Sequence, residues 1–371
     1  MKPIRMIPLL ACCLCASTAS AQATAPVHVQ VQRQPMLAQA RGQAWFVYEL
    51  HVSNLYDRPL SLDSVLVLAG EESGAPVRTY AGAALEKNLH RIGAAPDSAA
   101  ANVLGAGQTA LVFVWAPAAG AGLLAHRLVL STERGTRIAF ATPPVAVNPW
   151  PPLILGAPLR GDGWIAGNAP DPDSTPGHNR MLVGVGGRVV LPQRFAIDWT
   201  RLGADGRLWH TDPARNENWA AWDAEVLAVS AGTVIEAVDT LPDQTPPEFQ
   251  PGAANRLVLD VGGGFYAVYA HLRQGSLRVR AGDRVRIGQV VATVGNSGNS
   301  TGAHLHFQVL NAPSYIAGES VPYAFDAYEV QGVLDRPLDD FDAGASWRPE
   351  GRAGVEHRGD LPVGGEVIRF P

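Results

Sequence analysis

The chain has 371 residues, of which 47% are hydrophobic and 17% are charged, so it is long enough for two domains and too apolar for a disordered chain. Its 39 glycines and 29 prolines follow no Gly-x-y period, which excludes collagen and favours a turn-rich, mainly β protein. The formal net charge is −5 and no basic run occurs, so the sequence gives no sign of a nucleic-acid partner.

Residues 1–21 are predicted to be a secretory signal peptide. A basic start and an apolar stretch precede Ala19-Ser20-Ala21, which offers a cleavage site after Ala21. Leu9-Leu10-Ala11-Cys12 also resembles a lipoprotein cleavage box, although cutting there would leave an unusually short apolar core. All three cysteines lie in this segment, so the mature chain is expected to have no disulfide and no thiolate metal ligand.

Beyond this segment the chain is predicted to have no membrane span. The longest later run of apolar residues, 110–125, is interrupted by Pro117 and two glycines. It is also shorter than the roughly 20 residues that a spanning helix needs. We therefore expect a soluble exported protein, either periplasmic or secreted.

Residues 22–150 are predicted to form an immunoglobulin-like β-sandwich. Apolar residues alternate there in short runs bounded by turn residues, at 27–31, 46–52, 111–115, 128–130 and 138–140. Runs of period two between turns are typical of antiparallel sandwiches. A short helix is also predicted where Leu85, Leu89 and Ile92 share a face.

Three further segments follow the sandwich. Residues 151–178, rich in Pro, Gly and Asp, are predicted to be linker and loop, and residues 179–330 a second β-rich domain. Gly186-Gly187 and Gly262-Gly263-Gly264 each separate two apolar runs and are predicted to be hairpin turns. Neither is followed by a helical pattern, so neither is typical of a phosphate-binding loop. Residues 331–371 are predicted to be a C-terminal extension.

The residues best suited to chemistry lie in the second domain. In a strand, His304 and His306 project from one face because side chains alternate. Two adjacent imidazoles suit a zinc site in which one is a ligand and the other handles protons, although two ordinary strand histidines would give the same pattern. Asp198 lies in an apolar strand and needs a partner, which Arg194 could supply. His271 ends another apolar strand and taken alone is a structural histidine.

Five ordered pieces of sequence carry a family resemblance. They are Asp198, Ala231-Gly232-Thr233-Val234, Tyr269-Ala270-His271-Leu272, GDRVRIGQVV at 282–291 and GNSGNSTGAHLHF at 295–307. Together they resemble the lysostaphin-type (LytM-like) zinc endopeptidases, which cut peptidoglycan peptides. The resemblance covers about a third of the chain and implies a lysostaphin-like antiparallel β domain, the duplicated hybrid motif. It also implies zinc as the cofactor and peptidoglycan stem or cross-link peptides as the substrate.

The resemblance implies a role for each matched residue. Asp198 and His306 match zinc ligands, and His271 and His304 match the pair that activates water and stabilises the tetrahedral intermediate. In that mechanism the metal lowers the pKa of its water toward about 7 and polarises the scissile carbonyl. Either His271 or His304 could take the water proton, and the sequence leaves open which one does.

One ligand position departs from the family pattern. The family's leading histidine, four residues before the aspartate, falls on Arg194, whose guanidinium stays protonated and cannot bind a metal. We predict that His178 is the third zinc ligand, because it leads into the hairpin that delivers Asp198. His210, in the loop after Asp198, is the alternative, and Asp205 and Asp223 are weaker candidates that would offer oxygen. Arg194 is then expected to pair with Asp198 or with a substrate carboxylate.

Two other classes of function stay open at this point. One is a LytM-like protein without zinc that acts as a cell-wall binding module or as a regulator of cell-wall amidases. A more distant one is a sugar-binding sandwich protein. The presence of both Asp198 and His271 favours an enzyme, and the zinc content of the purified mature chain distinguishes the classes.

Overall fold

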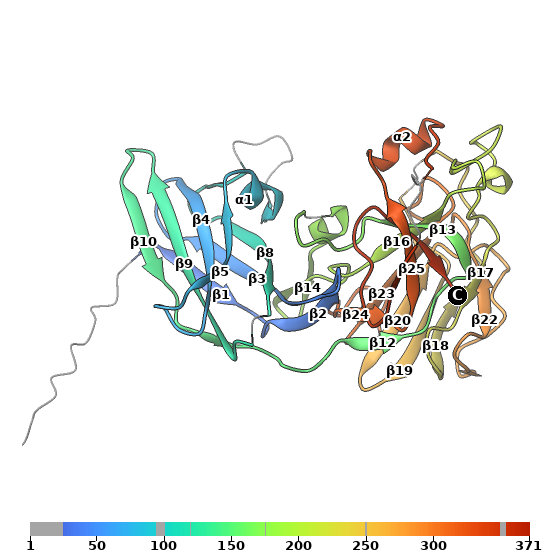
Figure 1. Ribbon diagram of the computed structural model, residues 1–371, viewed down its shortest axis with the longest axis horizontal. Coiled ribbons are helices and arrows are strands. Elements are labelled where there is room, and N and C mark those ends of the chain that lie inside the picture. Colours follow the sequence, from blue (N-terminus) through green and yellow to red (C-terminus); the bar gives the residue numbers. More distant parts are fainter. Residues whose placement is uncertain (1–24, 94–100, 119, 175, 249–250, 349–353) are drawn as a thin grey trace, which may run out of the picture.

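The computed structural model shows a mainly β molecule in two parts, which lie side by side in Figure 1 and confirm the predicted fold class. The predicted signal peptide, residues 1–21, lies outside the described residues. No helix in the described part of the chain has the length and apolar character needed to cross a membrane. The residues that the structure describes are 25–93, 101–118, 120–174, 176–248, 251–348 and 354–371.

Two sheets that share one core form the N-terminal part. Apolar side chains from both sheets, among them Val52, Val67 and Leu128, are buried in that core. The first sheet has the order β1-β3-β8-β6, with β2 beside β3, and its strands are β1 (Val27–Val31), β2 (Met36–Ala40), β3 (Gln43–Asn54), β6 (Leu89–Arg91) and β8 (Thr109–Pro117). The second has the order β10-β9-β4-β5, with β11 beside β9 and β7 beside β4, and its strands are β4 (Leu60–Ala69), β5 (Pro76–Ala81), β7 (Val103–Leu104), β9 (Leu123–Thr132), β10 (Arg137–Ala141) and β11 (Val145–Ala146). The immunoglobulin-like topology of this sandwich stays a prediction.

The helix predicted in this part is shorter than its apolar pattern indicates. Helix α1 spans Ala83–Lys87 and buries Leu85 in the sandwich core. Leu89 instead begins β6, and Ile92 packs against a separate cluster that includes Phe113. The pattern that we interpret as one helical face is therefore divided between a helical turn, a strand and a loop.

The C-terminal part is built on a ten-stranded sheet in which every neighbouring pair is antiparallel. Its order is β21-β18-β19-β20-β23-β16-β13-β27-β25-β26. Its strands are β13 (Gly161–Gly167), β16 (Ile197–Arg201), β18 (Gly232–Val238), β19 (Arg256–Gly262), β20 (Phe265–Ala270), β21 (Arg284–Val285), β23 (Leu305–Leu310), β25 (Tyr328–Val333), β26 (Val355–His357) and β27 (Glu366–Phe370). Buried aromatic side chains from Trp199, Phe307 and Phe325 pack together against this sheet.

Short elements complete the described part of the chain. The hairpin predicted at Gly186-Gly187 is confirmed, and both glycines have positive φ, of 57° and 76°. The predicted Gly262-Gly263-Gly264 turn joins β19 to β20. The remaining elements are three strand pairs, β12 (Leu153–Leu155) with β24 (Tyr323–Phe325), β14 (Val183–Val185) with β15 (Arg188–Val190) and β17 (Glu225–Leu227) with β22 (Val290–Thr293), and the short helices η1 (Gly177–Arg180), η2 (Asn216–Asn218) and α2 (Leu338–Asp342).

Some strands of the large sheet lie in ranges that we predict to be linker, loop or C-terminal extension. Strand β13 lies within 151–178, which we predict to be linker and loop, and it pairs with β16 and β27. Strands β26 and β27 lie within the predicted extension 331–371 and continue the same sheet. The period of β13 is concealed by its glycines and by a register shift between Gly161 and Trp164.

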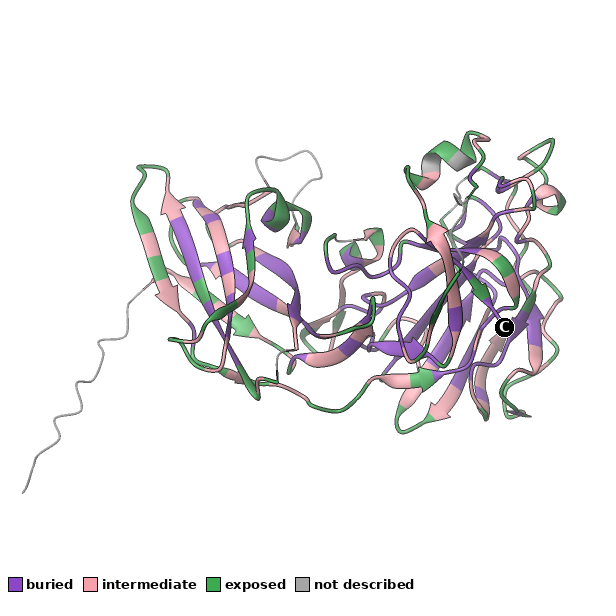
Figure 2. Cartoon of the chain, in the orientation of Figure 1, coloured by how far each residue is buried: buried purple, intermediate pink, exposed green. Residues whose placement is uncertain are grey.

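Strand β8 is buried along most of its length, as Figure 2 shows, and its side chains pack in the sandwich core and against the C-terminal part. Its residues 111–115 are all apolar, and alternate side chains point to opposite faces. The two valines of this run enter the sandwich core. The other three side chains pack against Leu182, Leu191 and Phe195 from the C-terminal part. The sandwich therefore covers the segment that leads into β16.

Arg194 does not lie where we predict it. Instead of pairing with Asp198, it is buried between the two parts, and its Nε donates a hydrogen bond to Glu49 Oε1 at 2.8 Å. Its guanidinium carbon lies 4.9 Å from the ring centre of Phe113 and 5.2 Å from that of Phe195. The residue belongs to the turn before β16, so strand alternation does not direct its side chain toward Asp198.

Candidate metal centre

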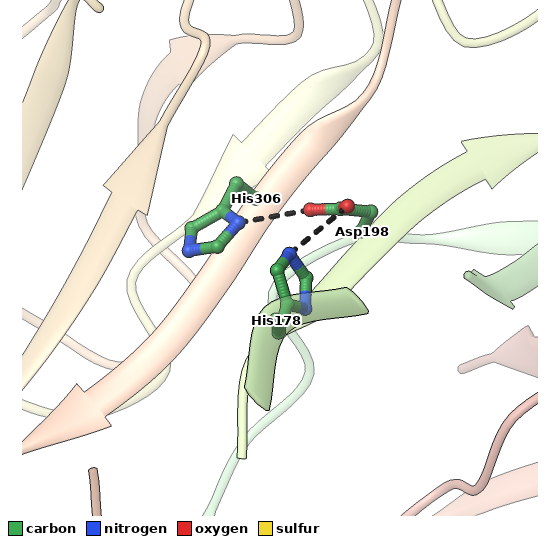
Figure 3. Close-up of side chains that lie close together, drawn as sticks. All are labelled: His178, Asp198 and His306. Atoms are coloured by element: carbon green, nitrogen blue, oxygen red, sulfur yellow. Dashed lines mark hydrogen bonds and ion pairs between the residues drawn. The ribbon is translucent and has the colours of Figure 1, made fainter. Parts of the chain in front are cut away.

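Three side chains from three separate elements converge, as Figure 3 shows: His178 of η1, Asp198 of β16 and His306 of β23. One ligand atom of each lies within 4.8 Å of the others. Strands β16 and β23 pair with Asp198 directly opposite His306, so the register of the sheet places these two. Within the described residues, this is the one group of three or more His, Cys, Asp or Glu side chains at such distances.

The hydrogen bonds of His306 determine which of its ring nitrogens faces the group. Its Nε2 lies 2.9 Å from Gln308 Oε1, and Gln308 uses its Nε2 to donate to the carbonyl of Tyr315 at 3.1 Å. Gln308 Oε1 is therefore an acceptor, and His306 Nε2 carries the hydrogen. The lone pair is left on Nδ1, which lies 2.8 Å from Asp198 Oδ1.

His178 is oriented in the same manner by a backbone carbonyl. Its Nδ1 lies 3.0 Å from the carbonyl oxygen of Asn168, so Nδ1 carries the hydrogen and donates it. The lone pair is left on Nε2, which lies 3.1 Å from Asp198 Oδ2. Asn168 also uses its side-chain Nδ2 to donate to Asp198 Oδ2 at 3.0 Å. A single residue thus holds both His178 and Asp198.

This donor set fits a metal ion. Two imidazole lone pairs point at a carboxylate from 2.8 and 3.1 Å, and three groups that only accept are stable together only with a cation between them. A proton or a metal ion meets that need. Two histidines and one carboxylate are a ligand set that zinc takes in catalytic sites, where a further position stays open to water or substrate. His178, Asp198 and His306 would hold the ion.

Two further histidines line the same site with their lone pairs free. His271 Nδ1 lies 2.7 Å from the carbonyl of Ser297, and His304 Nδ1 lies 2.9 Å from the carbonyl of Gly302. Each ring therefore carries its hydrogen on Nδ1 and its lone pair on Nε2. The ring centres of His271 and His304 are 4.5 Å apart, and His304 Nε2 lies 3.7 Å from Asp198 Oδ1. The two imidazoles stand side by side next to the candidate metal ligands.

The pKa shifts in the site favour the charged forms of Asp198 and His178 and the neutral forms of His271 and His304. Burial alone would raise the pKa of Asp198, but the facing His178 and His306 outweigh it and hold that pKa well below its usual value. Burial acts against the charged form of His178 too, but Asp198 outweighs it and raises the pKa of His178. For His271, burial and then the neighbouring His304 and His306 lower the pKa to about 3. Burial also lowers the pKa of His304. His271 and His304 are therefore neutral bases at pH 7.

Zinc binding is expected to weaken as the pH falls. The raised pKa of His178 means that a proton occupies its Nε2 in the metal-free protein below that pKa, which lies above the ordinary value of about 6.5. The ion must displace this proton, so affinity should fall by about tenfold per pH unit below the pKa. Calorimetric zinc titrations in buffers of different ionisation enthalpy measure the affinity and the proton release. Equal zinc affinity at pH values above and below the pKa of His178 would contradict the assignment of this residue as a ligand.

The structure brings together five of the residues singled out in the sequence and leaves Arg194 and His210 apart. His178, Asp198, His271, His304 and His306 share the site, whereas the alternative ligand, His210, is half-exposed with its Nδ1 3.2 Å from Asp205 Oδ2. Sequence reasoning missed two residues that orient the ligands, Gln308 and Asn168. Gln308 could have been found, because it lies two positions after His306 on the same strand face.

Comparison with known proteins identifies one segment of the chain. Residues 218–318 match the family model described as Peptidase family M23, which confirms the resemblance to lysostaphin-type peptidases. The match contains His271, His304 and His306 and begins after His178 and Asp198.

Three solved structures are similar to parts of the chain. The catalytic domain of lysostaphin from Staphylococcus simulans is 21% identical, with 43% of this chain and 88% of that chain covered and a TM-score of 0.24. The M23 metalloprotease pseudoalterin, described as from the deep sea, is 18% identical, with 47% and 76% covered and a TM-score of 0.25. A putative M23 peptidase from Pseudomonas aeruginosa is 16% identical, with 70% and 90% covered and a TM-score of 0.25.

Proposed function

We propose that this chain, which carries a peptidase family M23 domain at residues 218–318, is an exported zinc endopeptidase that hydrolyses peptide bonds in the stem or cross-link peptides of peptidoglycan. One observation carries the proposal: the lone pairs of His178 and His306 converge on Asp198 beside two neutral imidazoles. A metal-binding set next to a proton-handling pair is an arrangement that suits metal-assisted hydrolysis of an amide.

The residues of the chain divide the work in the proposed reaction. When bound, zinc supplies Lewis acidity, which polarises the scissile carbonyl and lowers the pKa of the attacking water. His271 and His304 each present a free Nε2, so one of them takes the water proton and can return it to the leaving amine. While the pair holds that proton, it would donate a hydrogen bond to the developing oxyanion. The carbonyls of Ser297 and Gly302 hold both rings in the required tautomer.

Replacing His271 or His304 with alanine is expected to separate turnover from metal binding. Both residues lie beside the ligands without belonging to the three-residue group, so zinc should stay bound at about one ion per chain. Turnover should fall about 10²- to 10⁴-fold, the usual contribution of a positioned acid or base. Zinc content by elemental analysis and kcat on a peptide substrate measure the two effects. A variant that loses zinc and turnover together would show that the residue is a ligand instead.

Digestion of purified peptidoglycan tests the substrate. Zinc-loaded protein is incubated with isolated cell walls, and the released fragments are analysed by mass spectrometry for new amino termini. We expect cleavage within peptides, inhibition by a metal chelator and recovery on adding zinc. Intact peptides after incubation would favour the non-catalytic alternative, an amidase regulator or cell-wall binding module.

Export is part of the proposal, and the amino-terminal sequence supports it. Residues 1–21 combine a basic start, an apolar core and the small residues before Ala21. Amino-terminal sequencing of the protein recovered from producing cells should find a chain that starts near Gln22. An intact Met1, or a lipid-modified Cys12, would contradict this cleavage.

A further inference from the structure

We propose that Arg41 and Arg78 of the N-terminal sandwich are positioning residues for the metal centre, because they hold the loop that carries His178. This rests on the proposed function, which assigns His178 to the zinc ion. It gives the sandwich a role in the peptidase site: the sandwich fixes a ligand that lies outside the matched segment 218–318.

The loop begins and ends at the metal centre. It leaves β13 at Asn168, whose φ is 47°, and continues to His178 in η1. Its first residue contacts both ligands, since the Asn168 carbonyl accepts from His178 and its amide donates to Asp198. The described residues between them therefore connect two positions that both contact the candidate ligands.

Two arginines of the sandwich hold the middle of this loop. Arg41, in the turn between β2 and β3, donates from Nη2 to Asp171 Oδ2 at 3.0 Å and from Nη1 to Asp173 Oδ2 at 2.9 Å. Arg78, in β5, donates from Nη2 to Asp173 Oδ1 and to the carbonyl of Pro172, both at 2.9 Å. Asp171 Oδ1 in turn accepts from the backbone N–H of Asp173 at 2.6 Å.

This network is firmer than an isolated surface ion pair. Single exposed pairs contribute little, but forked arginine bonds that join several charges can hold a segment in one geometry. Asp171 is only 8% exposed, and the guanidinium carbon of Arg78 lies 5.5 Å from the ring centre of Tyr80. The chain beyond His178 is held as well, because Leu182 packs against the cluster on β8.

A loop that is ordered before zinc arrives lowers the entropic cost of binding the ion. If the loop were free, His178 would lose conformational freedom each time an ion bound, and the affinity would fall accordingly. The arginines order the loop before binding. Partners that orient a metal ligand are worth about 10- to 100-fold in metal affinity.

A zinc titration with matched arginine variants tests this. The Kd for Zn²⁺ is measured by competition with a chromophoric chelator for the wild type, Arg41→Ala/Arg78→Ala and the control Arg33→Ala. Arg33 also crosses between the two parts, pairing with Glu319 at 3.2 Å, but it contacts a different segment. We expect the double variant to bind Zn²⁺ about 10-fold more weakly, and Arg33→Ala to match the wild type. Amide hydrogen exchange in the metal-free protein should become faster at 176–180 and stay unchanged in β23.

A double-mutant cycle keeps the test decisive if the double variant does not fold. Asp173→Asn and Arg78→Ala should each weaken Zn²⁺ binding, and the combined variant should lose less than the product of the two single factors, because both changes remove the bond between Arg78 and Asp173. A Kd in both single variants equal to that of Arg33→Ala would overturn the positioning role while the wild type still binds zinc. Absence of Zn²⁺ binding in the wild type would instead overturn the proposed function and, with it, this role.

Discussion

Replacing His178 with alanine is expected to abolish zinc binding and peptidase activity. Two protein ligands would remain, Asp198 and His306, whereas a catalytic zinc ordinarily needs three. Arg194 cannot substitute, because it is turned toward Glu49 and its guanidinium has no free lone pair. The loss of zinc affinity should exceed the roughly 100-fold that loss of an orienting partner gives. Zinc content per chain and the Kd for Zn²⁺ measure it.

His210→Ala is the matched control for this variant. It removes the same type of side chain from the same part of the molecule, but His210 pairs with Asp205 and lies outside the group of three. Its zinc content and activity should equal those of the wild type. If His178→Ala keeps a full complement of zinc while His210→Ala loses it, the ligand assignment is reversed.

Replacing Glu49 with alanine is expected to destabilise the protein by about 3–5 kcal/mol, the usual effect of breaking a buried ion pair. The Arg194 side chain is 2% exposed, and in the described structure its two terminal nitrogens have no hydrogen-bond partner. Glu49 therefore neutralises a charge that cannot reach water. Urea unfolding of the two proteins measures the difference in the free energy of unfolding.

A variant that removes both charges tests whether the lost stability comes from the unpaired charge of Arg194 or from lost packing. Glu49→Leu combined with Arg194→Met replaces the ion pair with apolar side chains, which is often neutral or stabilising. We expect most of the stability lost in Glu49→Ala to return. A Glu49→Ala protein as stable as the wild type would show that Arg194 is neutralised in another way.

The candidate site could be predicted from the sequence wherever strand periodicity places a side chain. His304 and His306 share a face because they are two residues apart in β23, and the family motifs add Asp198 and His271. Asp198 and His306 are 108 residues apart, and their spacing gives no sign that they are paired across two strands. The family resemblance supplied that contact.

The residues that sequence reasoning missed or misplaced lie outside regular strands. Asn168 directly follows β13 and has a positive φ. The glycines of this range are typical of a loop, so no strand periodicity points to this residue. Arg194 lies in a turn, where the direction of its side chain is set by the sandwich rather than by alternation. The contact between the two parts is detectable in the sequence, because the unbroken apolar run at 111–115 indicates a strand covered on both faces.

The strand order of the large sheet has a consequence for the order in which the surroundings of Asp198 can form. β27 is the last of its strands along the chain, yet it pairs with β13, and β13 pairs with β16, which carries Asp198. Pairing between strands so far apart in sequence forms late, because a long loop must close first. Strand β16 therefore lies in an unfinished sheet until β27, the last of these strands in chain order, has paired with β13. Asp198 reaches its final surroundings only when that last strand has joined the sheet.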